Sequence, residues 1–157
     1  MHLAADPKDE EFRAELLAFI DEHCPSEALH GRDEIGSDET DERGVTVIPA
    51  WAREWQATLF DHGWMIPGYS PELGGRNCTP VQTLLYLEEM ASRGILRSLH
   101  FPGYAIVAPS LLEYGNEEQR KLVPAAIRGG HTAAVERFAR TTGAAGQVHS
   151  AATEDAE

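Results

Sequence analysis

The chain has 157 residues and a formal net charge of −13 at pH 7, with 42% hydrophobic and 25% charged residues. This length predicts one compact domain, and the composition is typical of a globular protein. No apolar run approaches the roughly 18 residues that a membrane helix needs, so we expect no membrane insertion. The acidic balance and the scattered Lys and Arg residues disfavour nucleic acid as a partner.

The ends of the chain and its two cysteines exclude further classes. The first eleven residues lack the basic start and apolar stretch of a secretory signal, so we expect a cytoplasmic protein. Cys24 and Cys78 have no CxxC spacing and no histidines at metal-ligand spacing. We therefore expect two free thiols, with no disulfide and no metal site.

A first helix is predicted within residues 1–26. Asp6 and Pro7 suit its start, since a carboxylate accepts from free N–H groups and proline at the first helical position loses no hydrogen bond. Its apolar residues recur at helical spacing, and Pro25 ends the pattern. Residues 27–44 are polar and acidic but lack the ligand pattern of an EF-hand loop, so we expect a solvated connection there.

A second helix is predicted from about Pro49 to Gly63, with Trp51, Trp55 and Leu59 at i, i+4 and i+8. Such a stripe favours core packing over a stacking site. An irregular loop follows, with Gly74 and Gly75 inside it. These two glycines alone are a weak phosphate-loop signal, because a preceding strand and a Lys-Ser/Thr ending are both missing.

A third helix is predicted from the Thr79 cap to Gly94. Apolar residues cover much of its circumference, so we expect it to be central to a bundle. Glu88 and Glu89 could suggest acid–base chemistry. However, adjacent helical residues point about 100° apart, which favours a partly buried salt-bridging or capping role.

A fourth helix is predicted over residues 101–114, with Pro109 either bending it or starting a new helical piece near Ala108. Asn116 and Gln119 then have the spacing of a capping box, which begins a short helix that ends near Gly129. Residues 131–157 are poor in large apolar side chains. We expect a short helix at most over 132–140 and disorder in the remainder.

Four blocks in this order carry a family resemblance: GWMIPGYSPELGGR (63–76), LEE (87–89), HFPG (100–103) and LLEYGNEEQ (111–119). Together they resemble the amino-terminal helical domain of the acyl-CoA dehydrogenases over about residues 45–129, and we place this domain at residues 45–130. The resemblance implies an all-α orthogonal bundle of about five or six helices. It also implies a parent family that uses FAD to dehydrogenate acyl-CoA thioesters between the α and β carbons.

The family's flavin motif and catalytic carboxylate have no counterpart in this sequence. Where the Glu-Pro-Gly-x-Gly-Ser-Asp type of motif belongs, the chain reads AAVERFARTTGAAG (133–146). We therefore name no catalytic and no cofactor-binding residue, and we expect no FAD to be bound by this chain alone. The resemblance does imply an acyl-pocket wall, formed by Leu99, Pro102, Gly103 and Ile106. The competing interpretation is that these four residues share one helical face that packs against the helix containing residues 84–90.

Three functions remain open at this point. The first, which we favour because the unpatterned tail begins where a core strand is expected, is a truncated acyl-CoA dehydrogenase that is inactive alone. The alternatives are one piece of a multichain dehydrogenase and a non-catalytic helical interaction module. Acyl-CoA is expected as a substrate only if the missing domains are supplied, for example by a dehydrogenase partner chain. An isolated copy is expected to expose apolar residues that the missing domains would cover, namely Ile95, Leu96, Leu99, Phe101 and Tyr104.

Overall fold

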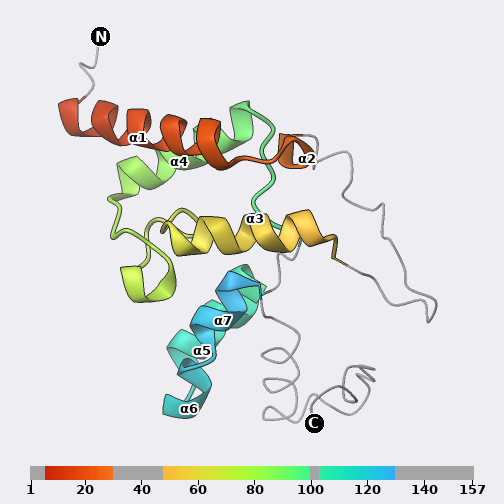
Figure 1. The fold of residues 1–157 in the computed structure, drawn as a ribbon. Coiled ribbons are helices and arrows are strands. Elements are labelled where there is room, and N and C mark those ends of the chain that lie inside the picture. Colours follow the sequence, from red (N-terminus) through yellow and green to blue (C-terminus); the bar gives the residue numbers. More distant parts are fainter. Residues whose placement is uncertain (1–5, 30–47, 100–102, 130–157) are drawn as a thin grey trace. The chain divides into compact units, whose positions relative to one another are not determined.

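The computed structural model describes residues 6–29, 48–99 and 103–129, which belong to two compact units, residues 1–100 and 101–157 (Figure 1). All regular secondary structure in these residues is helical. The first unit contains α1 (Pro7–His23), α2 (Ser26–Leu29), α3 (Ala50–Asp61), a 3-10 turn (Pro71–Leu73) and α4 (Pro80–Ser92). The second contains a π-helix (Gly103–Val107), α5 (Ala108–Tyr114), α6 (Glu117–Arg120) and α7 (Val123–Arg128). The predicted all-α fold class is confirmed.

Helix α1 begins and ends as its sequence predicts. The Asp6 side chain accepts a hydrogen bond from the Lys8 amide at 2.9 Å, and the helix stops before Pro25. Its apolar residues lie on one buried face: Phe12, Leu16, Phe19 and Ile20. This face packs beside α4 (Figure 1).

Aromatic rings fill the core of the first unit. The Phe12 and Trp64 rings lie 5.3 Å apart between centroids, and Phe19 stacks on Trp55 at 6.0 Å. Trp55 is buried, and its indole N–H donates to the Leu96 carbonyl at 2.9 Å. Buried aromatic pairs of this kind supply both apolar area and preferred ring geometry. The core interpretation of the tryptophan stripe is confirmed for Trp55.

Helix α4 carries the predicted cap but not the predicted burial. Thr79 and Gln82 form a complete capping box at its start. However, Val81, Leu84 and Leu87 are 55%, 65% and 41% exposed. The expectation that α4 is central to a bundle is therefore wrong: one side of this helix is buried against α1, and these three residues face outward.

The connection predicted for residues 27–44 begins with helix instead. Helix α2 covers Ser26–Leu29, and Ala28 within it is fully buried. The Ala28 carbonyl accepts from the Leu96 amide at 3.0 Å, which attaches the segment after α4 to this helix. The remainder of the predicted acidic connection lies outside the described residues, as does the predicted tail from residue 131 onward, with its short helix over 132–140.

In the second unit, new helices begin at prolines: Pro109 lies in the first turn of α5 and Pro124 in that of α7. A π-helical turn over Gly103–Val107 precedes α5, and Pro109 lies in the first turn of α5, where it loses no intrahelical bond. This confirms the predicted new helical piece near Ala108. The Asn116–Gln119 capping box is also present, with both bonds at 2.9 Å. Val123, Ala126 and Ile127 of α7 are fully buried.

Candidate functional site

One member of the acidic pair on α4, Glu89, joins α4 to α1. Glu89 is buried, and its Oε1 accepts from Arg13 Nε of α1 at 2.7 Å, while Arg93 Nε lies 3.4 Å from Oε2. Glu88, its neighbour, points to solvent. A carboxylate engaged by two guanidinium groups is committed to a structural ion pair. The predicted salt-bridging role is therefore confirmed for Glu89.

The glycine-rich loop after α3 does not form a phosphate cradle. A phosphate site of this kind needs several backbone N–H groups that point at the ligand. In this loop the amides of residues 73–78 are all engaged by nearby carbonyls: those of Gly74 and Gly75 donate to Pro71 and Ser70, and those of Arg76 and Cys78 both donate to Pro67. The backbone amides of this loop are therefore used within the loop and are not free to bind a phosphate group.

The space around these glycines is also filled. Gly74 has φ +77°, and a Cβ there would overlap the Phe60 ring; a Cβ at Gly75 would overlap the Tyr69 carbonyl. Arg76 closes the loop, with its guanidinium 4.2 Å above the Trp64 ring and ion-paired with Glu15 of α1. Glycine is required here so that the loop can fold tightly on the core.

The four residues of the predicted acyl-pocket wall have different surroundings. Leu99 is half-buried in a non-helical segment, directly after Ser98, whose hydroxyl donates to Gln56 Oε1 at 2.5 Å. Pro102 lies outside the described residues. Gly103 is buried and Ile106 is exposed, both in the π-helix. Leu99 therefore shares no helix with Gly103 and Ile106, and the wider winding of a π-helix changes the face that residues three apart share. Their role as a pocket wall stays a prediction.

Neither cysteine is activated. Burial raises the pKa of the Cys24 thiol, and burial also raises that of Cys78, against the opposing influence of the Arg76 charge. A raised pKa lowers the fraction of reactive thiolate. Among the residues that the structure describes, no group of three or more His, Cys, Asp or Glu side chains is arranged to hold a metal ion.

The exposed apolar surface differs from the one expected. Ile95 is buried, its backbone amide donates to the Met90 carbonyl, and the adjoining Leu96 amide donates to the Ala28 carbonyl of α2. Its predicted exposure is wrong. Leu96, Leu99 and Tyr104 are half-buried, and Phe101 lies outside the described residues. The largest apolar exposures in the first unit lie instead on α2 and α4.

Comparison with known proteins identifies the family. The sequence model for "Acyl-CoA dehydrogenase, N-terminal domain" matches residues 6–130. The chain belongs to this family. It is also 28% identical over 130 residues to "Acyl-CoA dehydrogenase FadE26" of Mycobacterium tuberculosis strain H37Rv, an alignment that covers 83% of this chain. The chain spans about 30% of the length of that relative.

The extent of the family match brings α1 inside the acyl-CoA dehydrogenase N-terminal domain. The resemblance seen in the sequence begins at residue 45, whereas the match begins at residue 6. The structure gives a physical reason, since α1 supplies the partners of two charged groups, Glu89 and Arg76. No helix of the described residues is long and apolar enough to cross a membrane.

Proposed function

We propose that this chain is the helical amino-terminal part of an FAD-dependent acyl-CoA dehydrogenase and that it does not catalyse dehydrogenation alone. The observation that carries the proposal is the family match over residues 6–130, combined with coverage of only about 30% of an intact dehydrogenase. In this interpretation the helices shape one side of an acyl-binding pocket. The flavin and the proton-abstracting base come from other domains.

Two features of the described residues support a scaffolding role over a catalytic one. The buried carboxylate Glu89 is held in a structural ion pair, and the glycine-rich loop uses its amides internally. A flavin needs donors and shaped surroundings that are free to engage it. The proposal therefore assigns acyl-CoA and FAD to the assembled enzyme. It keeps Leu99, Pro102, Gly103 and Ile106 as the proposed acyl-pocket wall, in which Ile106 is exposed.

The exposed face of α4 favours an assembled enzyme over the alternative of a self-sufficient interaction module. Val81, Leu84 and Leu87 follow one another at helical spacing and all three are exposed. Exposed apolar residues gathered on one helix mark a surface that another domain or a partner protein covers. Both remaining forms, a truncated dehydrogenase and one chain of a multichain enzyme, are consistent with this surface.

The test is reconstitution. The chain is purified alone and is then mixed with a second chain that supplies the flavin and carboxy-terminal domains of a related dehydrogenase. We expect no flavin absorbance and no acyl-CoA-dependent dye reduction from the chain alone, and both from the mixture. Activity of the chain alone would refute the scaffolding role, and a mixture that never associates would favour the interaction module.

The pocket assignment is tested in the same mixture. Ile106→Ser should raise the KM for acyl-CoA, because it replaces an apolar wall with a hydroxyl. Tyr114→Ser is the matched control, since Tyr114 is exposed in the same unit and is not assigned to the pocket. Equal effects of the two substitutions would exclude Ile106 from the pocket wall.

A further inference from the structure

Two histidines that are distant in the sequence meet between the ends of α1 and α3. His23 is the last residue of α1 and His62 is the C-cap residue of α3. Their ring centroids are 4.8 Å apart, with 38° between the ring planes. The Phe19 ring contacts both, at 4.9 Å from His23 and 5.2 Å from His62. Packing against one buried ring therefore holds the two imidazoles next to each other.

The tautomer of His62 follows from its hydrogen bond. Its Nδ1 lies 2.9 Å from the Thr58 carbonyl oxygen. A carbonyl oxygen only accepts, so in the neutral imidazole Nδ1 carries the hydrogen and Nε2 keeps the lone pair. Histidines that bind metals almost always donate their other ring N–H to a backbone carbonyl or carboxylate in this way. His62 is thus prepared as an Nε2 ligand.

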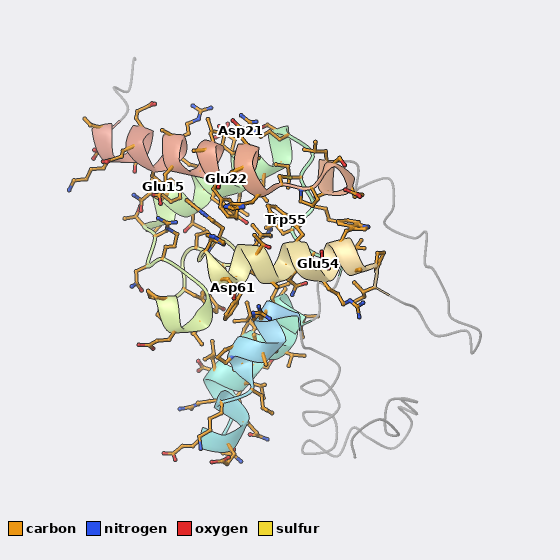
Figure 2. All side chains as sticks on the ribbon, in the orientation of Figure 1. Glu15, Asp21, Glu22, Glu54, Trp55 and Asp61 are labelled. Atoms are coloured by element: carbon orange, nitrogen blue, oxygen red, sulfur yellow. The ribbon has the colours of Figure 1, made fainter. Side chains whose placement is uncertain are left out.

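The surroundings of the pair favour a cation. α1 and α3 have 17 and 12 residues, and each histidine lies at the C-terminal end of its helix, where the helix dipole is negative. Glu22 Oε2 lies 3.8 Å from His23 Nε2. Figure 2 labels Glu22 on α1 and Asp61 on α3, each of which precedes one of the histidines. Arg76 is a positive charge nearby, with Nη1 3.5 Å from the His62 carbonyl oxygen, and its ion pair with Glu15 offsets that charge.

The distance between the ring centroids permits both rings to ligate one ion through one nitrogen each. With a metal–nitrogen distance of about 2.0–2.1 Å, each ring centre lies about 3.2 Å from the metal, so two imidazoles at about 90–110° have centres about 4.5–5.2 Å apart. The observed 4.8 Å lies inside this interval. Imidazole ligands suit late first-row divalent ions, with Cu²⁺ bound more tightly than Ni²⁺ or Zn²⁺.

We propose that His23 and His62 together bind one late first-row divalent transition-metal ion. Because the described residues hold no group of three or more protein ligands, water completes the coordination, and the ion exchanges readily. The sequence alone predicts no metal site, since the two ligands lie on different helices. The proposed site is independent of the dehydrogenase function and joins the ends of α1 and α3 when it is occupied.

The experiment titrates Ni²⁺ into the full chain by calorimetry and measures the melting temperature in parallel. The starting variant carries Gln in place of the five histidines outside the described residues: His2, His30, His100, His131 and His149. From this variant, His23→Gln and His62→Gln are made singly. His62→Phe is a second variant that keeps an aromatic ring against Phe19 while removing the ligand nitrogen.

We expect one equivalent of Ni²⁺ to bind the starting variant and to raise its melting temperature, because the ion binds the folded state. Each single substitution should weaken binding by roughly tenfold or more. Mg²⁺ should have no effect, because it prefers oxygen ligands. Absence of Ni²⁺ binding in the starting variant would overturn the proposal. Unchanged affinity in a folded His62→Gln or His62→Phe chain would also overturn it, leaving the ring contact as packing alone.

Discussion

Replacing Glu89 by Gln should destabilise the first unit strongly, because Glu89 is the shared partner of Arg13 and Arg93. Breaking a buried ion pair by removing one partner costs about 3–5 kcal/mol when the other charge stays buried. Here the Glu89 side chain is only 9% exposed, but Arg13 and Arg93 are 49% and 39% exposed and regain water. Because both arginines regain water, we expect Glu89→Gln to lower the free energy of unfolding by only about 2 kcal/mol, close to the value of a hydrogen bond to a charged group.

The assay is thermal unfolding followed by circular dichroism. For a unit of the size of residues 1–100, a loss of about 2 kcal/mol lowers the melting temperature by about 8–16 °C. Glu88→Gln is the matched control, since its carboxylate is exposed, and should change stability by less than about 0.5 kcal/mol. A double-mutant cycle with Arg13→Gln isolates the pair, and we expect a coupling of about 1 kcal/mol or more. Equal stability of the Glu89→Gln and Glu88→Gln chains would refute the structural role of Glu89.

Three further predictions concern single positions of the first unit. Gly74→Ala should lower the free energy of unfolding by several kcal/mol, because the Gly74 backbone is left-handed and its Cβ would overlap the Phe60 ring. Gly68→Ala should cost much less in the same denaturant titrations, because only the Thr83 hydroxyl, 3.3 Å away, has to shift slightly. Thr79→Ala should cost about 1 kcal/mol through loss of the α4 cap, measured in the same way. Cys24 and Cys78 should react with iodoacetamide more slowly in the folded chain than in urea. Because burial raises both thiol pKa values above their unfolded values, stability should fall as the pH rises past about 9, and a flat profile there would contradict this.

The features that could be predicted from the sequence are local ones. Asp6, Thr79 and Asn116 cap their helices as predicted, because each side chain bonds to an amide two or three residues away. Pro109 starts a helix for the same kind of local reason. The family blocks also supplied the fold class, since their order along the chain is more specific than the pattern of any one helix.

The features that could not be predicted depend on contacts between distant segments. The sequence shows that Glu88 and Glu89 cannot share a proton, but it does not show that Arg13 is the partner of Glu89. Apolar residues around α4 indicate a buried helix, yet whether Leu84 is covered depends on which neighbours are present. The meeting of His23 and His62 has no sequence signal, because it follows from the packing of α1 on α3.

The bond between Arg13 and Glu89 has a consequence for synthesis of the chain, because 76 residues separate its two ends. At about 5–20 residues per second, a ribosome needs about 4–15 s to add the segment between them. During this time α1 has been made but α4 has not, so Arg13 lacks its carboxylate partner and the part of the α1 face that α4 covers stays exposed. A nascent chain stalled before Pro80 should therefore recruit a holding chaperone, and one extended well beyond Ser92 should release it.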